Sequence, residues 1–296
     1  MTTARTVRVF APAKINLFLH VGERRGDGYH ALQSLVVFAD IGDELRLRHA
    51  RGLALSVEGP FASSLAGQGD NLVLSAARVV AEEARMPAAA DIVLTKNLPV
   101  ASGIGGGSAD AAAAMRGLVR LWRIFPDEPR LLARAATIGS DVPVCVASAP
   151  AWMEGRGDII VSAGVLPRLP LVLVNPGVPV STADVFRALK SRRGTAMERP
   201  RMLQDGAALL EFLATTTNDL EAPARALQPA IGDVIEELSA QPGALMTRMS
   251  GSGATCFAIF ASEPASAAAT KALGAAHLNW WVRAAHIAPN NIGAVQ

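Results

Sequence analysis

The sequence has 296 residues, of which 50% are hydrophobic and 18% charged, a composition typical of a folded chain with room for one large domain or two ordinary ones. A net charge of +2 excludes the strong basic excess typical of nucleic-acid-binding proteins. No apolar run approaches the ~18 residues of a membrane span, and the N-terminus lacks a signal-peptide pattern, so we expect a cytoplasmic protein without nucleic-acid or membrane partners.

The first third of the chain predicts strands followed by one helix. Apolar and polar residues alternate in four segments, at 6–22, 31–40, 43–50 and 52–59. Residues 71–85 then change to helical spacing, and Asn71 is a plausible N-cap for that helix.

The remainder of the chain mixes helices and strands. The patterns predict a strand at 91–99, helices at 109–122 and 127–139, a buried strand at 169–177, an exposed and mobile loop at 190–206, a helical stretch at 221–241, and a strand–turn–strand at 245–261. These strands outnumber what a simple βαβ alternation needs, so we expect an α+β fold, divided near residues 150–165. Cys145 and Cys256 lie in apolar stretches without metal-ligand spacing, which predicts buried free thiols.

Residues 98–118, LPVASGIGGGSADAAAAMRGL, place glycines directly before a predicted helix. The P-loop pattern is excluded because no lysine lies between Lys96 and Lys190, and the dinucleotide fingerprint fails because Ser108 stands in its third glycine position. Glycines still allow close approach to the backbone, and the first turn of a helix carries unpaired N–H groups, so we expect a phosphate site. Ser108 is the natural N-cap or a ligand of phosphate or metal, whereas Asp110 would repel phosphate unless it points away or meets a cation.

Three further segments carry polar residues in apolar surroundings. Strand alternation in PAKINLFLHV puts Lys14, Asn16 and Phe18 on one face, and lysine is rare in this chain. Asp141 in IGSDVPVCV stands between a helix end and an apolar strand, either as a turn residue or as a carboxylate for a substrate hydroxyl. The stretch MSGSGATCFAIF holds a second glycine turn, either a plain hairpin or a substrate contact.

Taken in this order, the segments resemble the GHMP kinases. The glycine loop PVASGIGGGSADAA and the later SGSGAT turn match two family motifs, and RRGDGYH, GSDVP and NDLE resemble the branch that acts on CDP-linked methylerythritol in the non-mevalonate route to isoprenoid precursors. The resemblance implies two domains, residues 1–160 with a fold like domain 2 of ribosomal protein S5 and residues 161–296 with a ferredoxin-like fold. It also implies an active site in the cleft between them and a monomer or weak homodimer.

The resemblance further implies transfer of the ATP γ-phosphoryl group to the 2-hydroxyl of CDP-methylerythritol, with Mg²⁺. Lys14 and Asp141 would be the catalytic pair, and Ser108 would lie near the β-phosphate or the metal. The nucleotide-binding residues would be Pro99, Val100, Ala101, Ser102, Gly103, Ile104, Gly105, Gly106, Gly107, Ser108 and Ala109. The substrate-binding residues would be Asn16, Tyr29, His30, Thr182 and Phe186, with Tyr29 and His30 on the cytosine and Phe186 as a second aromatic against it.

Three alternatives remain open at this point. Another GHMP kinase, acting on mevalonate or homoserine, would have no base for Tyr29 and His30 to recognise. A non-catalytic binding protein that kept the fold is disfavoured because Lys14, Asp141 and Ser108 are present. An RNA-binding protein is disfavoured by the low net charge and the scarcity of aromatic residues.

Overall fold

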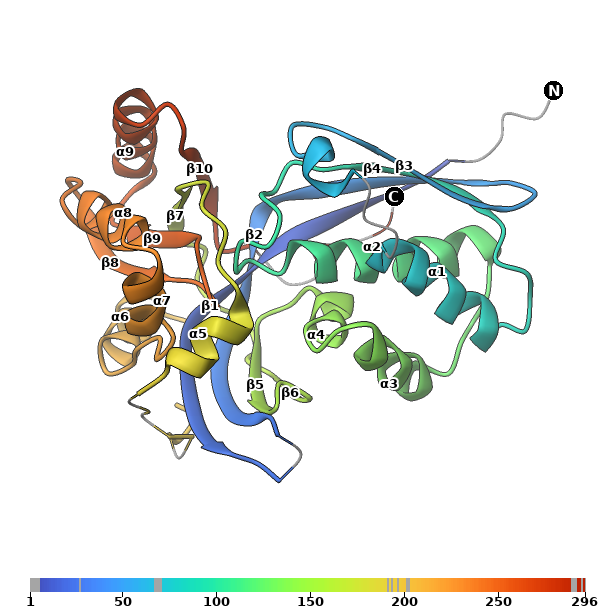
Figure 1. Ribbon diagram of the computed structural model, residues 1–296, viewed down its shortest axis with the longest axis horizontal. Coiled ribbons are helices and arrows are strands. Elements are labelled where there is room, and N and C mark those ends of the chain that lie inside the picture. Colours follow the sequence, from blue (N-terminus) through green and yellow to red (C-terminus); the bar gives the residue numbers. More distant parts are fainter. Residues whose placement is uncertain are drawn as a thin grey trace.

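The computed structural model describes residues 6–26, 28–66, 71–190, 192, 194–195, 197–200, 203–288, 292–293 and 295. Two β-sheets lie side by side, and each is covered by its own group of helices (Figure 1). The fold is therefore α+β with two domains, as the sequence predicts.

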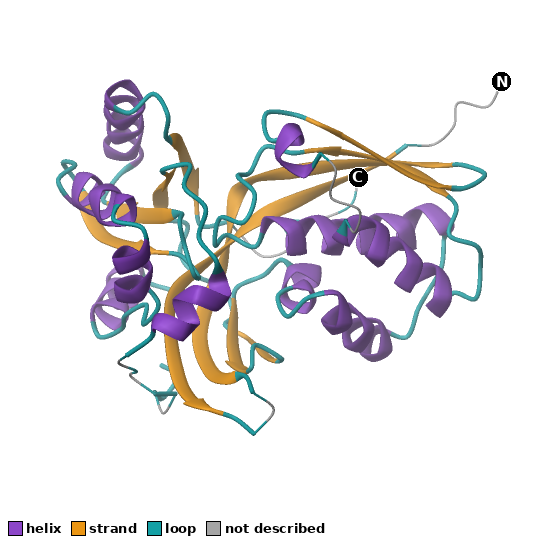
Figure 2. Cartoon of the chain, viewed as in Figure 1, coloured by secondary structure: helices purple, strands orange, loops and turns teal. Residues whose placement is uncertain are grey.

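The first sheet is built on two long strands, which extend well beyond the others (Figure 2). Its strands are β1 (Val7–Arg24), β2 (His30–His49), β3 (Leu53–Glu58), β4 (Ala90–Thr95), β5 (Ala151–Gly155) and β6 (Ile159–Ser162). The order is β3-β4-β2-β5-β6, with β1 antiparallel to β2, and only the β3–β4 pair is parallel. β4 and β5 pair with successive parts of β2, so this strand organises the whole sheet.

β2 is one strand, although alternation predicts two strands separated near residue 41. At the apparent break, Gly42 lies opposite Pro12 of β1, and a Cβ on Gly42 would be 2.2 Å from the carbonyl oxygen of Ala11. The glycine therefore lets the two backbones approach closely, and pairing continues through it. The register shifts between Pro12 and Lys14, which re-aims the side chains that follow.

Helices form a layer over one face of this sheet. They are α1 (Leu72–Glu83), α2 (Gly106–Trp122), α3 (Glu128–Ile138) and α4 (Val142–Ala147), with the short 3₁₀ turn η1 (Ala62–Leu65) before them. The predicted cap of α1 is confirmed, since the Asn71 side chain accepts a hydrogen bond from the Val73 N–H at 2.9 Å. α3 ends at Ile138, directly before Gly139, also as predicted.

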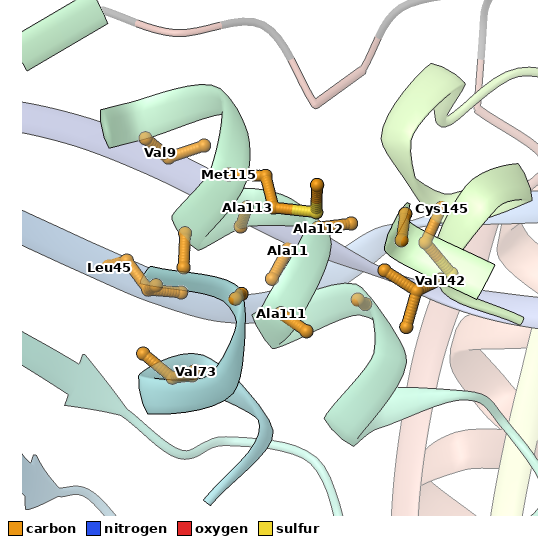
Figure 3. Packing of buried hydrophobic residues seen from close by; sticks show 14 of the residues in the cluster. Val9, Ala11, Leu45, Val73, Ala111, Ala112, Ala113, Met115, Val142 and Cys145 are labelled. Carbon is orange, nitrogen blue, oxygen red and sulfur yellow. The ribbon is translucent and has the colours of Figure 1, made fainter. Parts of the chain in front are cut away.

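α2 is the central helix of this layer and is buried nearly all round. Ala111, Ala112 and Ala113 have no exposed surface. Figure 3 shows them between β1, which carries Ala11, and helix α4, which carries Val142 and Cys145. Small side chains let α1, α4, β1 and β2 all pack closely on one helix. The alanine-rich run is therefore a packing feature.

Both cysteines are buried free thiols, as predicted. Burial raises the pKa of Cys145 to about 12, and it also raises the pKa of Cys256. Both thiols are therefore protonated and unreactive near neutral pH.

The second sheet comprises β7 (Pro170–Asn175), β8 (Ala244–Met249), β9 (Cys256–Phe260) and β10 (Trp281–His286), in the order β10-β7-β9-β8 with every pair antiparallel. Its helices are α5 (Thr182–Ala188), α6 (Gly206–Ala214), α7 (Glu221–Leu227), α8 (Ala230–Ser239) and α9 (Glu263–Ala276). This order and the β-α-β-β-α-β sequence of elements match a ferredoxin-like fold. The helical stretch predicted at 221–241 is two helices, because Pro229 cannot donate the backbone hydrogen bond that would join them.

The two domains share apolar packing through β1. A cluster of buried residues joins Ile15 and Leu17 of β1 to Leu171 of β7 and Phe257 of β9. The predicted division between residues 160 and 161 falls inside β6, which pairs with β5, and this division stays a prediction.

Phe18 lies on the wrong face for the strand alternation that the sequence predicts. The register of β1 shifts between Asn16 and Phe18, so the Phe18 ring packs against Trp152 and Phe212 and not beside Lys14. A β-bulge of this kind adds one residue to the strand and inverts the alternation after it.

The loop predicted at 190–206 lies partly outside the described residues. In its described part, Gln33 exchanges two hydrogen bonds with the backbone of Met197, and Arg199 forms an ion pair with Glu154 at 2.7 Å. This part of the loop is therefore attached to β2 and β5, and α6 begins at its last residue, Gly206.

Candidate active site

A pocket of about 520 Å³ lies between the two domains, where β1, the glycine loop and the SGSG turn meet. The predicted site residues that line it are Lys14, Asn16, Val100, Ala101, Ser102, Gly103, Gly105, Gly106, Gly107, Ser108, Asp141, Thr182 and Phe186. The predicted residues that do not line it are Pro99, Ile104, Ala109, Tyr29 and His30. Pro99, Ile104 and Ala109 have buried side chains on the inner side of the loop.

Lys14 and Asp141 form an ion pair in the wall of this pocket. The Lys14 Nζ lies 2.6 Å from Oδ2 of Asp141, and the lysine side chain is 5% exposed while that of the aspartate is 31% exposed. The lysine is therefore desolvated and charge-compensated, and the carboxylate remains open to a ligand. The short spacing also makes the pair a preorganised unit.

The segment after Asp141 is helix α4, and the strand expected there is wrong. Asp141 is the residue before the first turn of α4, and Pro143 occupies an early position of that helix. Proline is well tolerated there because the N–H groups of a first turn have no partner within the helix. The apolar run VPVCV is short, and its period does not distinguish a buried strand from a buried helix.

The glycine loop enters α2 earlier than the sequence suggests. Gly105 is the N-cap, with the left-handed φ of 64°, and Gly106, Gly107 and Ser108 form the first turn. The expectation that Ser108 caps the helix is therefore wrong, and its hydroxyl is free of that role. These residues line the pocket, so the unpaired N–H groups of the first turn of this 17-residue helix lie at the pocket. This is the arrangement that binds anions.

The glycine loop and the SGSG turn are packed directly on each other. A Cβ on Gly103 would lie 2.5 Å from the carbonyl oxygen of Ser250. The Ser250 hydroxyl donates to the Gly103 carbonyl at 3.0 Å and accepts from the Asn16 N–H at 3.1 Å, while the Thr255 N–H donates to the Ser102 carbonyl. Ser250 is fully buried, so one hydroxyl joins β1, the loop and the C-terminal domain.

The NDLE segment holds the SGSG turn from the other side. The Asn218 side-chain amide donates to the carbonyls of Met249 and Gly251, both at 2.8 Å, and its oxygen accepts from the Leu220 N–H. Glu221 accepts from the Met249 N–H at 3.0 Å. These contacts fix the turn that supplies Gly251 and Ser252 to the pocket.

Asp110 meets a cation, one of the two outcomes left open by the sequence. Its Oδ2 lies 2.7 Å from the Lys96 Nζ, which also lies 2.5 Å from Oδ2 of Asp43. Asp43 accepts further hydrogen bonds from the backbone N–H groups of Asn97 and Leu98. All three charged side chains are buried, and burial raises the pKa of Asp110 to about 8.

Asn16, Thr182 and Phe186 bring three elements to the pocket. The Asn16 amide donates to the Ser34 hydroxyl at 2.8 Å, while its buried Oδ1 has no partner among the described residues. Thr182, at the start of α5, lies 2.7 Å from the Ser252 hydroxyl, which joins α5 to the SGSG turn. The unpartnered Asn16 oxygen is available to a donor on a ligand.

Tyr29 and His30 lie beside the pocket. The His30 ring stacks on Phe186 with centroids 5.6 Å apart, and its Nδ1 lies 3.2 Å from the Gly22 carbonyl oxygen. Tyr29 is 60% exposed, and its ring is within 5.5 Å of the Arg156 guanidinium carbon. Phe186 therefore faces His30 in this structure, and the Tyr29 ring is largely exposed.

The chain matches one enzyme family over most of its length. The model of the GHMP kinases N terminal domain matches residues 71–149, and the model of the GHMP kinases C terminal domain matches residues 195–279. A 4-diphosphocytidyl-2-C-methyl-D-erythritol kinase of Paramagnetospirillum magneticum is 49% identical over 277 residues, which cover 94% of this chain and 97% of the relative. This chain belongs to the 4-diphosphocytidyl-2-C-methyl-D-erythritol kinase family of the GHMP kinases.

Further relatives agree with this membership. The protein of the same name from Parvibaculum lavamentivorans is 50% identical and covers 92% of this chain and 95% of its own. A crystal structure of a 4-(cytidine 5'-diphospho)-2C-methyl-D-erythritol kinase has a TM-score of 0.78 at 32% identity, covering 95% of this chain and 99% of that one. A homoserine kinase from Cytophaga hutchinsonii, at 20% identity and a TM-score of 0.67 over 100% of this chain and 99% of that one, shares the fold. As a member of this kinase family, the chain is an ATP-dependent kinase.

Several pocket residues of this family member are missing from the sequence-based list of site residues. Lys96 and Asp110 line the pocket floor, and Arg156 and Gly157 line it from the turn after β5. Lysine is rare in this chain, and this rarity singles out Lys96 as much as Lys14. The GRGD turn is visible in the sequence, but which side of the molecule it faces depends on the β2–β5 pairing.

The pocket of this kinase brings together protein oxygens of the kind that Mg²⁺ binds. No group of three or more His, Cys, Asp or Glu side chains that could hold a metal occurs among the described residues. Ser108 and Asp141 bring a hydroxyl and a carboxylate to one pocket, and Mg²⁺ takes one or two protein oxygens together with phosphate oxygens.

In the described part of the chain, no helix is long and apolar enough to cross a membrane.

Proposed function

We propose that this kinase transfers the γ-phosphoryl group of ATP to the 2-hydroxyl of 4-diphosphocytidyl-2-C-methyl-D-erythritol, giving the 2-phosphate and ADP, on the non-mevalonate route to isoprenoid precursors. The observation that carries the reaction is the Lys14–Asp141 pair at 2.6 Å, in a pocket bordered by the first turn of α2. The acceptor is proposed from the printed name of relatives that are 49% and 50% identical.

Asp141 orients the acceptor hydroxyl or takes its proton as the oxygen attacks the γ-phosphorus. Its side chain is 31% exposed, so its second oxygen is open to the pocket while Oδ2 contacts Lys14. Lys14 holds Asp141 in place through the ion pair and offers positive charge to the transferring group. Phosphoryl transfer depends mainly on positioning and electrostatics, so both roles follow from one preorganised pair.

The loop of residues 99–109 holds the triphosphate. The first-turn N–H groups of Gly106, Gly107 and Ser108 carry the partial positive charge of a helix N-terminus. Bound Mg²⁺ would neutralise charge on the phosphates, and the Ser108 hydroxyl would be available to hold it. Gly107 is exposed, and a Cβ added to it would meet only Leu72 within 4 Å, at 3.5 Å, so its backbone is accessible to a phosphate.

The cytidine end of the acceptor lies over the turn between β1 and β2 and over α5. Tyr29 offers an exposed ring for stacking, while His30 and Phe186 form a stacked pair beside it. Asn16 has a free buried oxygen at the acceptor side of Lys14, and Thr182 contributes a hydroxyl from α5. These five residues are proposed to recognise the acceptor, and the loop is proposed to recognise ATP.

A coupled ATP assay tests this assignment. The acceptors CDP-methylerythritol, mevalonate and homoserine are offered separately to the purified protein, and ADP release is measured. We expect turnover with the CDP compound only. Turnover of mevalonate or homoserine without the CDP compound would overturn the proposed acceptor and leave the kinase assignment intact.

A further inference from the structure

A second pocket, of about 870 Å³, lies at the other end of α2 from the glycine loop. It is lined by the last turns of α2, the residues that follow them, the end of α4, and Gly293 and Val295. None of its lining residues lines the first pocket. The two pockets are therefore separate, and the proposed reaction makes no use of the second.

Three arginines face this pocket from one side of a helix. Arg116, Arg120 and Arg123 stand at positions i, i+4 and i+7, which places them along one face of α2 and its C-cap. No carboxylate lines the pocket, and none of the three forms an ion pair with a carboxylate in the part of the chain that the structure describes. One cation would be enough to offset the partial negative charge at a helix C-terminus, so Arg120 and Arg123 together carry more charge than the end of α2 requires.

Arg116 forms the base of the pocket. Its Nη1 donates to the carbonyls of Cys145 and Val146, and its Nη2 donates to the carbonyl of Phe10. Its Nε is buried and has no partner among the described residues, and burial lowers the pKa of Arg116 to about 10. Charged groups in such surroundings are normally paired, so this guanidinium favours a bound anion.

The rest of the pocket lining is apolar. Phe125 is 98% exposed, the largest exposed fraction among the large hydrophobic residues that the structure describes, and it lines the pocket together with Ile124 and Val119. Val146 and Val295 complete this wall. An exposed ring beside uncompensated arginines matches a ligand with one charged end and one apolar end.

We propose that this pocket binds a soluble diphosphate ester of an apolar chain, with the diphosphate on Arg120 and Arg123 above Arg116 and the chain against Phe125 and Ile124. A diphosphate supplies several acceptor oxygens and more than one negative charge, which suits guanidinium forks better than a single carboxylate does. The apolar chain covers the ring that is otherwise fully in water.

Calorimetric titration of the protein tests the proposal, with geranyl diphosphate, inorganic pyrophosphate and geraniol as probes. Saturating ADP is present throughout, so that the first pocket is filled. We expect geranyl diphosphate to bind at least about tenfold more tightly than either of the other two probes, because each lacks one half of the contact. Equal binding of pyrophosphate and geranyl diphosphate would overturn the apolar half of the site.

Two variants locate the binding. The double variant Arg120→Ala/Arg123→Ala should weaken geranyl diphosphate binding roughly tenfold or more, and Phe125→Ala about fivefold. The control Arg51→Ala/Arg78→Ala removes the same charge from exposed positions outside the pocket and should leave binding unchanged. Kinase activity and thermal stability should stay at the wild-type level in all three, since the changed side chains lie outside the first pocket. Unchanged binding in the Arg120→Ala/Arg123→Ala variant, or binding of geranyl diphosphate that is seen only when ADP is left out, would sink the proposal.

Discussion

The ammonium group of Lys96 lies between Asp110 and Asp43, 2.7 Å from one carboxylate and 2.5 Å from the other. An unpaired Asp110 would repel phosphates. In this structure Asp110, Lys96 and Asp43 instead form a buried ion-pair triad beneath the loop. A Cβ on Gly106 would lie 3.1 Å from the Lys96 Nζ, so the triad supports the first residue of α2 directly. It thereby holds in place the first turn of α2, which is proposed to bind phosphate.

The triad predicts a pH dependence of stability. Two carboxylates share one cation, and burial raises the pKa of Asp110 to about 8, well above its ordinary value. Between roughly pH 4 and 8 the triad therefore holds a proton that the unfolded chain has released, and its contribution to the free energy of unfolding falls as pH rises. Asp110→Asn should remove this slope in urea unfolding, while the exposed control Asp233→Asn keeps it. Parallel slopes in all three proteins would contradict the prediction.

Asp141→Asn should separate binding from turnover. Asparagine keeps the size of the side chain but loses the charge that faces Lys14 and the ability to accept a proton. We expect kcat to fall by about 10²-fold or more, while the dissociation constant of ATP changes little because the glycine loop is untouched. Steady-state kinetics and ATP titration measure the two quantities. A fully active variant would show that the proposed role of Asp141 is wrong.

Two loop glycines should respond differently to alanine. At Gly107 the nearest atom to an added Cβ is 3.5 Å away, so Gly107→Ala should fold normally and raise the KM for ATP, because the methyl group blocks a phosphate. At Gly103, φ is 76° and an added Cβ would lie 2.5 Å from the Ser250 carbonyl oxygen, so the same change should lower the melting temperature. Gly274→Ala, with open space around it, is the control for both. An unchanged KM in a folded Gly107→Ala protein would argue against close approach of a phosphate there.

Removal of the Tyr29 ring should affect one substrate only. Tyr29→Ala should raise the KM for CDP-methylerythritol by roughly tenfold, the loss of one stacking contact, and leave the KM for ATP unchanged. Tyr29→Phe keeps the ring and should behave like the wild type. Equal changes in both KM values would argue against base stacking at this position.

Sequence patterns predict the elements whose signals are local. The Asn71 cap, the end of α3 at Gly139 and the strands β7 and β9 all follow from side chains within a few residues of them. The motifs also assign Lys14 and Asp141 to one site although they are 127 residues apart in sequence, because both belong to the family pattern. Their contact itself cannot be read from spacing.

The errors arise where a distant backbone decides the local structure. β2 continues through Gly42 because β1 passes close to it, and the bulge before Phe18 inverts an alternation that looks regular in the sequence. Ser108 looks like a cap, but Gly105 reaches the left-handed region and starts the helix three residues earlier. The role of Asp110 depends on Asp43, which the sequence places 67 positions away.

The Ser250 hydroxyl and the apolar cluster around Ile15 have a consequence for how such a chain can be divided. Part of the packing of the first strand is against β7 and β9, and the left-handed turn of the glycine loop at Gly103 lies directly against Ser250 and Gly253 of the second domain. The two halves therefore are not exchangeable modules. A hybrid made by joining residues 1–160 to the second half of a distant GHMP kinase would have to match this buried surface residue by residue before it could fold.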